Sequence, residues 1–180
     1  AYGGAHIHMI PIVMDHGFGI AEATSVMGVV GLGILAGRVI TGFLLDRFWA
    51  GHVAFPLLCL PAVACFMLMG QDSAVPMLLI AGFMLGFAAG AESDLIAYLA
   101  GRYFGMGHYG KIYGMLYLPF GLFSAISPMV YGAVRDATGS YDGVLMVAAP
   151  MFVIGGGLLL LLGRYPDSFP PIEPQASEAA

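Results

Sequence analysis

Long apolar runs separated by short clusters of charged residues are the feature of this sequence that most constrains its fold. The charges gather at 15–22, 46–47, 102–111 and 135–142, and the stretches between these clusters are mostly apolar. A helix needs about 20 predominantly apolar residues to cross the hydrocarbon core of a bilayer. The spacing therefore predicts membrane-spanning helices that are joined by short polar turns.

The composition excludes a water-soluble globular domain. Hydrophobic residues make up 59% of the 180 positions and charged residues only 9%, whereas a soluble domain carries roughly 25% charged residues. The net charge is −5, and the six Lys and Arg residues form no basic patch. We therefore expect a lipid bilayer as the surroundings and no nucleic acid as a partner.

The layout predicts an all-α integral membrane protein with one partial and five complete spans. The partial span, 2–14, is too short to cross a bilayer alone, so we expect a fragment whose first helix is truncated. The complete spans are expected at 23–45, 52–69, 75–99, 112–134 and 143–162. A transmembrane bundle then occupies 1–164. Four prolines among acidic and small residues predict that 165–180 is a disordered tail.

The basic residues predict the orientation of the bundle. Alternating turns place one basic residue, Arg135, on one side of the membrane and four on the other, namely Arg47, Arg102, Lys111 and Arg164. Short cytoplasmic turns carry an excess of Lys and Arg. The C-terminus is therefore expected in the cytoplasm, and we expect the membrane to be a bacterial inner (cytoplasmic) membrane.

Arg38 is the foremost candidate for a binding residue, because it is ionisable and lies inside a span. It comes eight residues before Asp46, which places it about 12 Å along a helix from the cytoplasmic end. A guanidinium at that depth needs an anionic partner and pairs with a carboxylate through two parallel hydrogen bonds. Two interpretations stay open: a substrate anion, or a structural pair with an acid of a neighbouring helix.

Glu92 and Asp94 are the acids of the predicted 75–99 helix. They are two residues apart and therefore point to roughly opposite sides of the helix. Both are expected near its cytoplasmic end, where one pairs with Arg47 in the adjacent turn. We favour this structural role, although proton carriage by either acid stays open.

Histidine and cysteine residues give no metal-site pattern. The spacing of His6 and His8 places their rings on different faces of a helix, which argues against a shared metal ion. Either ring is a candidate for a proton-linked group that lines a cavity, and the alternative is a packed polar side chain. Cys59 and Cys65 are six apart in one apolar run and are interpreted as core residues. No metal or other cofactor is expected.

Two helical stripes indicate packing or binding faces. Tyr113, Tyr117, Phe120 and Ser124 follow a three-to-four spacing and share one face. This face is a candidate wall for a small organic substrate, with ordinary helix packing as the alternative. Small residues at four-residue steps on the 75–99 helix predict close approach of another helix, namely Gly82, Gly86 and Gly90.

The turn after the 23–45 span resembles a signature of the major facilitator superfamily. Gly42 to Arg47 reads Gly-x-x-x-Asp-Arg, as in the cytoplasmic loop between helices eight and nine of that family. Later segments are similar to the monocarboxylate and oxalate/formate-type members, namely 90–95, 102–105, 110–114 and 136–141. The resemblance covers nearly all of the chain up to Arg164.

The resemblance implies two six-helix bundles around a central cavity that opens alternately to either side. This chain would supply the end of helix seven through helix twelve as inverted three-plus-three repeats, and its partner would be the missing N-terminal half. Gly42, Asp46 and Arg47 would form a cytoplasmic gate, in which Asp46 caps a helix of the other bundle and Arg47 pairs with an acid on helix ten. Glu92 or Asp94 would be that acid.

The resemblance also bears on the substrate. Arg38 falls where carboxylate-transporting members place a substrate-binding arginine. The oxalate type has a lysine deep in helix eleven, whereas this chain has only Lys111 at the mouth of that helix. A monocarboxylate held by Arg38, with Tyr117, Phe120 and Ser124 beside it, fits better than a dicarboxylate held by two cations.

The predicted function is secondary transport of a small organic anion, with or without a coupled proton. An enzyme is not expected, because no Ser/His, Cys/His or clustered metal-ligand set occurs at membrane depth. Two alternatives remain. One is an exporter of drugs or other metabolites in which Arg38 is structural, and the other is a non-transporting sensor that kept the fold.

Overall fold

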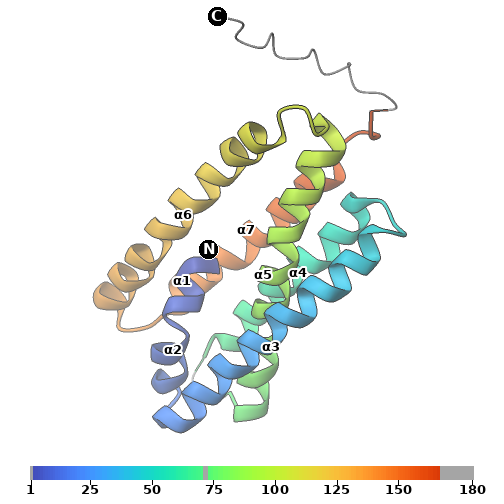
Figure 1. The fold of residues 1–180 in the computed structure, drawn as a ribbon. Coiled ribbons are helices and arrows are strands. Elements are labelled where there is room, and N and C mark those ends of the chain that lie inside the picture. Colours follow the sequence, from blue (N-terminus) through green and yellow to red (C-terminus); the bar gives the residue numbers. More distant parts are fainter. Residues whose placement is uncertain (1, 71–72, 167–180) are drawn as a thin grey trace, which may run out of the picture.

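The computed structural model describes residues 2–70 and 73–166, and every regular element within these ranges is a helix (Figure 1). Five of the helices are long and apolar enough to cross a membrane. The predicted all-α membrane fold is therefore confirmed. The elements are α1 (Tyr2–Ile7), α2 (Met9–Asp15), α3 (Ile20–Leu45), α4 (Ala50–Leu68), α5 (Val75–Phe104), α6 (Tyr109–Thr138) and α7 (Asp142–Leu160).

The predicted partial span at 2–14 is divided into α1 and α2 at His8. Pro11 has no backbone N–H, so the carbonyl of Ile7 lacks the donor that a continuous helix would give it. Backbone hydrogen bonds resume on both sides, from His8 N to Gly4 O at 3.0 Å and from Ile12 N to His8 O at 2.8 Å. The segment is therefore one helix with a local break at His8.

Helix α5 extends further than the sequence predicted, which corrects the expected depth of its acids. It ends at Phe104, not Leu99, because Gly105 adopts a φ of 74° that terminates the helix. The last turn keeps Arg102, a cation at the favourable end of the helix dipole. Glu92 therefore lies about 18 Å from the end of α5, well inside the span and not near its mouth.

Helices α3 and α5 pack with their backbones in direct contact. A Cβ atom at Gly86 would overlap the carbonyl oxygen of Val30, and one at Gly90 would overlap that of Ile34. Small residues at such positions allow two membrane helices to approach closely. The glycine stripe predicted on this helix therefore packs against α3.

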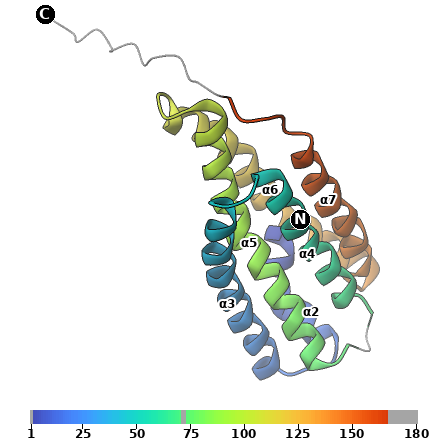
Figure 2. The ribbon, with the colours of Figure 1, turned by 90° about the vertical axis from the view of Figure 1, so that its right-hand side faces the viewer.

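Helices α3, α4, α5 and α7 form the packed part of the bundle, and α6 lies to one side of it (Figures 1 and 2). Buried residues of α6 are few, namely Ser127 and Tyr131. Ser127 accepts a hydrogen bond from the backbone N–H of Gly4 at 3.0 Å. Helix α6 is thus held chiefly through α1, and much of its surface is open.

The alternating helices give the bundle two chemically different ends. The basic end carries the turns after α3 and α5 and the chain after α7, with Arg47, Arg102, Lys111 and Arg164. The acidic end carries the turns after α2 and α6, with Asp15, Asp136 and Asp142. This division is the one on which the predicted orientation rests.

Tyr165, which the sequence placed in the tail, packs against the basic end. Its hydroxyl accepts a hydrogen bond from Ala50 N at 2.9 Å. Its ring lies 4.5 Å from the guanidinium carbon of Arg102 and 5.2 Å, centre to centre, from the ring of Tyr103. Tyr165 therefore joins the chain after α7 to α4 and α5. The rest of the predicted disordered tail, from 167 on, lies outside the described residues.

Candidate functional site

Arg38 lies on an open face of α3 and approaches Asp94 of α5. Its Nη1 atom is 3.8 Å from Asp94 Oδ1, and the two side chains are 55% and 34% exposed. This separation is longer than a hydrogen bond, so the ion pair is loose. A guanidinium has five N–H donors, and one long contact leaves most of them available to another anion.

The predicted gate residues lie at the basic end and make few contacts within the described part of the chain. The guanidinium of Arg47 lies 4.6 Å from the centre of the Phe43 ring. No ion pair of Arg47 occurs among the described residues, and Asp94 faces Arg38 instead. Gly42 and Asp46 are exposed, with open space around Gly42. The predicted closure of this end against a second bundle stays a prediction.

Glu92 lines a cavity of about 160 Å³ at membrane depth. Four helices contribute to it: α5 with Glu92 and the helices α1, α6 and α7 with Tyr2, Gly3, Phe120, Phe123, Ser124 and Phe152. The cavity brings Glu92, which the sequence assigned to gating, together with two residues that were predicted to bind substrate, Phe120 and Ser124. The sequence missed this arrangement because the end of α5 was placed too early.

A ladder of aromatic rings runs along α6 from the basic end toward this cavity. The ring centres of Tyr109 and Tyr113 are 5.7 Å apart, those of Tyr113 and Tyr117 are 5.4 Å apart, and those of Tyr117 and Phe120 are 5.0 Å apart. The predicted shared face of α6 is thus present. Tyr117 is exposed, and Phe120 connects the ladder to the Glu92 cavity.

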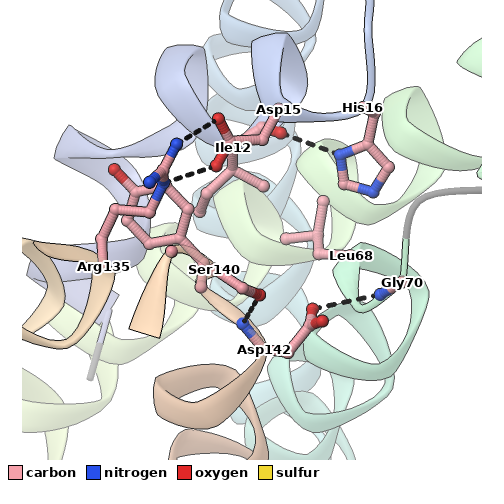
Figure 3. A pocket seen from close by; sticks show the side chains of 10 residues that line it. Ile12, Asp15, His16, Leu68, Gly70, Arg135, Ser140 and Asp142 are labelled. Atoms are coloured by element: carbon pink, nitrogen blue, oxygen red, sulfur yellow. Dashed lines mark hydrogen bonds and ion pairs between the residues drawn. The ribbon is translucent and has the colours of Figure 1, made fainter. Parts of the chain in front are cut away.

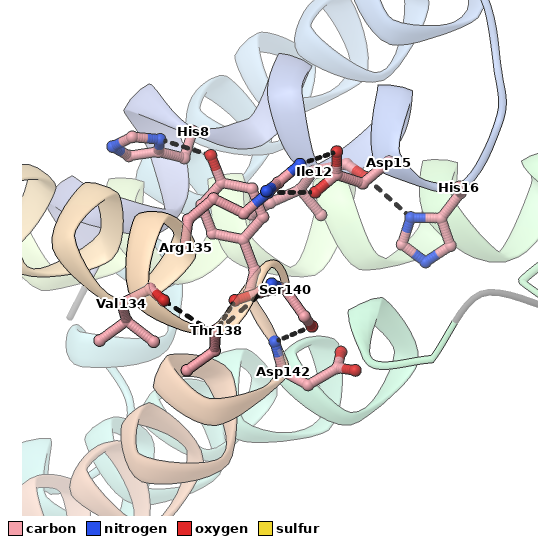
Figure 4. A network of polar contacts seen from close by, with 10 residues as sticks. His8, Ile12, Asp15, His16, Val134, Arg135, Thr138, Ser140 and Asp142 are labelled. Carbon is pink, nitrogen blue, oxygen red and sulfur yellow. Dashed lines mark hydrogen bonds and ion pairs between the residues drawn. The ribbon is translucent and has the colours of Figure 1, made fainter.

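His8 bridges α2, α6 and the turn after α6 (Figure 4). Its Nε2 atom is 3.0 Å from the carbonyl oxygen of Pro128, which can only accept, so Nε2 carries a proton. Its Nδ1 atom shares a hydrogen bond of 2.9 Å with the hydroxyl of Tyr141. His6 has a different partner, because its Nδ1 lies 3.2 Å from the hydroxyl of Tyr2.

Asp15 and Arg135 form a two-pronged ion pair beside this histidine (Figure 4). The distances are 2.7 Å from Nε to Oδ2 and 2.9 Å from Nη2 to Oδ1. The guanidinium also lies 5.7 Å from the centre of the Tyr141 ring. Burial raises the pKa of Tyr141, the Asp15 carboxylate raises it further, and Arg135 acts in the opposite direction.

A polar pocket of about 240 Å³ opens at the acidic end (Figure 3). Asp142 accepts a hydrogen bond from Gly70 N at 3.1 Å, and His16 Nδ1 donates to the carbonyl of Ile12 at 2.8 Å. The Asp142–Gly70 contact joins the start of α7 to the chain after α4, whereas the His16–Ile12 contact lies within the end of α2. In the described part of the chain, no three His, Cys, Asp or Glu side chains are placed to hold a metal ion together.

The sequence profile of the Major Facilitator Superfamily matches residues 4–180. The chain belongs to this superfamily. Its apolar helices and its family identify it as an integral membrane protein. The comparison with solved structures gives no significant match.

Curated relatives of this major-facilitator chain are monocarboxylate transporters. It is 25% identical over 167 residues to monocarboxylate transporter 11 of Homo sapiens, covering 88% of this chain and 36% of the relative. It is 25% identical to monocarboxylate transporter 12 of Xenopus laevis (82% and 33% covered) and to monocarboxylate transporter 13 of Bos taurus (89% and 38% covered). The chain thus spans about a third of the length of these relatives.

These relatives confirm the predicted resemblance to monocarboxylate-type members of the superfamily. Relatives named as transporters also agree with the prediction that the chain is no enzyme. They are animal proteins, so the predicted bacterial membrane gains no support from them.

Proposed function

We propose that this chain forms the C-terminal six-helix half of a major-facilitator transporter that moves a small monocarboxylate across the cytoplasmic membrane by alternating access. The observation that carries the proposal is Arg38, a half-exposed guanidinium about 10 Å inside the basic end of α3. Relatives named as monocarboxylate transporters support the substrate class. The N-terminal half of the same protein is the proposed partner, and the C-terminus is proposed to lie in the cytoplasm.

Arg38 is proposed to bind the carboxylate of the substrate through two parallel hydrogen bonds. Asp94, 3.8 Å away, compensates the charge of the guanidinium when no substrate is bound. An incoming carboxylate replaces Asp94 as the closer partner. The ring of Phe120, the hydroxyl of Ser124 and the open face of Tyr117 provide an amphipathic wall for the organic part of the substrate.

The basic end is proposed to act as a gate between the two bundles. Asp46 would cap a helix of the N-terminal bundle, and Gly42 leaves the exposed surface on which that bundle approaches. Arg47, held over the Phe43 ring in this conformation, is free to pair with an acid when the gate closes. Inverted repeats would relate the two ends, which the similar charged exits of α3 and α6 support.

A second candidate function is export of drugs or other metabolites, with Arg38 as a structural residue. The approach of Asp94 to Arg38 favours this alternative, because the two charges compensate each other without a substrate. The two functions predict different results when the Arg38 guanidinium is removed: carboxylate uptake depends on Arg38 in the first and does not depend on it in the second.

Uptake of labelled acetate, lactate and pyruvate into vesicles that carry the full-length protein tests the proposal. Arg38→Ala and the charge-preserving Arg38→Lys are compared with the wild type at equal protein levels. Loss of a charged hydrogen-bond partner predicts a fall in uptake of roughly 10- to 100-fold in Arg38→Ala. Arg38→Lys keeps the charge but not the two-pronged geometry, so its uptake should lie between that of the wild type and that of Arg38→Ala. Carboxylate uptake that survives Arg38→Ala would favour the exporter.

A further inference from the structure

Glu92 has no counter-charge within the described part of the chain. It lies about 18 Å inside the end of α5, and no ion pair of Glu92 occurs in the ranges 2–70 and 73–166. Arg38 and Asp94, the charged groups nearest to it in depth, approach each other at 3.8 Å and compensate each other. A carboxylate away from water needs a cation or hydrogen-bond donors beside it. Glu92 therefore favours the arrival of a positive charge.

Aromatic rings surround this carboxylate. The cavity of about 160 Å³ that Glu92 lines is also lined by four aromatic side chains of α1, α6 and α7, namely Tyr2, Phe120, Phe123 and Phe152. We call Glu92 and these four rings the aromatic cage. The face of an aromatic ring attracts a cation, and such cages recognise quaternary ammonium groups. A carboxylate among the rings strengthens this preference, because an uncharged apolar group gains nothing from it.

Arg38 and Glu92 lie at similar depth in the bundle. A Cβ atom at Gly90 would lie 3.1 Å from Arg38 N, and one turn further along α5 Asp94 approaches the guanidinium of Arg38. Glu92 comes between these two positions, so its level along the helix differs from either by about 3 Å. The guanidinium and the aromatic cage are therefore neighbours in depth on two sides of one helix.

The open side of α5 connects the guanidinium with the aromatic cage. Successive residues of a helix turn by about 100°, so Ser93 lies between Glu92 and Asp94 on the way round α5. Ser93 is partly exposed, whereas Ala91 and Leu95 on the opposite side are buried. The span across this side is on the order of 10 Å, the diameter of a helix with its side chains. One small molecule with a charge at each end can therefore contact both groups.

The charges decide what kind of molecule fits. Since Arg38 and Asp94 compensate each other, the charge of Glu92 is left over, and a simple carboxylate would add a second negative charge. A molecule with one carboxylate and one cationic nitrogen adds no net charge. We propose that the substrate is a zwitterionic monocarboxylate, whose carboxylate binds Arg38 and whose quaternary ammonium group binds in the aromatic cage. This inference rests on the proposed function and adds the substrate class to it.

Uptake into vesicles that carry the full-length protein tests the inference with probes that differ in charge. γ-Butyrobetaine joins a carboxylate to a trimethylammonium group through a short methylene chain. Its neutral isostere has a carbon atom in place of the nitrogen and keeps the shape, and lactate represents simple monocarboxylates. The wild type is compared with Glu92→Gln and Arg38→Ala at equal protein levels. Glu22→Gln is the matched control, since it makes the same chemical change in the first turn of α3.

The wild type should take up γ-butyrobetaine with a KM roughly tenfold below that of the isostere, because the two probes differ only in the charge that the aromatic cage attracts. Glu92→Gln keeps the size of the side chain and removes its charge. The KM for γ-butyrobetaine should therefore rise roughly tenfold, while the KM for the isostere stays the same or falls. Glu22→Gln should match the wild type with every probe. Arg38→Ala should lose uptake of both probes, since both bind through the carboxylate.

Other outcomes separate this inference from the proposed function. A wild type that takes up the isostere or lactate as well as γ-butyrobetaine would overturn the zwitterion and leave the monocarboxylate transporter standing, and this comparison needs no variant that folds. Equal loss of γ-butyrobetaine and isostere uptake in Glu92→Gln would overturn it too, because Glu92 would then be structural. A preference for γ-butyrobetaine that survives Glu92→Gln would overturn the aromatic cage. A wild type that moves none of the probes would refute the proposed function itself.

Discussion

The guanidinium of Arg135 donates to both carboxylate oxygens of Asp15, from Nε at 2.7 Å and from Nη2 at 2.9 Å. This pair joins the end of α2 to the last turn of α6, a helix with only Ser127 and Tyr131 among its buried residues. The contact therefore fastens the acidic end of α6 to a bundle from which most of that helix stands apart.

Removing either partner of this pair should loosen α6 without changing the rest of the bundle. Asp15→Asn and Arg135→Gln should each lower the melting temperature of the purified full-length protein modestly, because solvent screens a pair at the surface. The double variant should lower the melting temperature by less than the sum of the two single changes. Strictly additive losses in such a double-mutant cycle would mean that the pair contributes nothing to stability.

Backbone contact between α3 and α5 makes a second prediction. Gly86→Ala and Gly90→Ala insert a methyl group where Val30 O and Ile34 O now lie, so each should cost about 1–3 kcal/mol of stability. Gly155→Ala on α7 is the control, since its added methyl meets open space and should change stability by less than about 1 kcal/mol. Thermal unfolding in detergent measures all three, and equal effects would contradict the close packing.

The Arg135–Asp15 pair and the α3–α5 backbone contact differ in how far the sequence predicts them. The glycine stripe is a local pattern at four-residue steps, and it identifies a packing face whatever the partner. The Arg135–Asp15 and His8–Tyr141 contacts join residues 120 and 133 positions apart, and no local spacing encodes them. The sequence therefore predicts the helices and their small-residue faces but misses the polar network at the acidic end.

The depth of Glu92 was misjudged for a different physical reason. Charged residues near Arg102 suggested that the helix ends at Leu99, yet a helix continues through polar residues until its backbone is interrupted. Gly105, with its positive φ, provides that interruption. Tyr165 was also misplaced by composition. The prolines and acidic residues that follow it predict disorder, whereas its hydroxyl binds Ala50 N and its ring contacts Arg102 at the basic end.

The Tyr141 hydroxyl makes a prediction about alkaline pH. Its pKa is raised above the ordinary value of 10.0, chiefly by burial, so the folded protein holds this proton more firmly than the unfolded chain. The stabilisation is fully present below pH 10 and is lost as the pH rises through the raised pKa of the folded state. Tyr141→Phe lacks this group and loses the hydrogen bond to His8.

The wild type should therefore melt at a higher temperature than Tyr141→Phe at neutral pH, and the difference should shrink as the pH rises from about 9 to about 11. Comparison with the variant removes the contribution of the other tyrosines, which both proteins share. A difference that stays constant over this range would show that Tyr141 stabilises the fold through its ring alone.

Asp94→Asn separates the two interpretations of Arg38. If Arg38 binds the substrate, Asp94 competes with the incoming carboxylate across 3.8 Å, and its neutral variant should bind the anion more tightly. The KM for monocarboxylate uptake should then fall by roughly twofold to tenfold, since a half-exposed pair is worth on the order of 0.5–1.5 kcal/mol. If Arg38 is structural, Asp94→Asn leaves an uncompensated guanidinium in the membrane, so the melting temperature should fall while KM stays the same. Measuring KM and melting temperature on the same preparation of the full-length protein decides between them, because the two interpretations move different quantities.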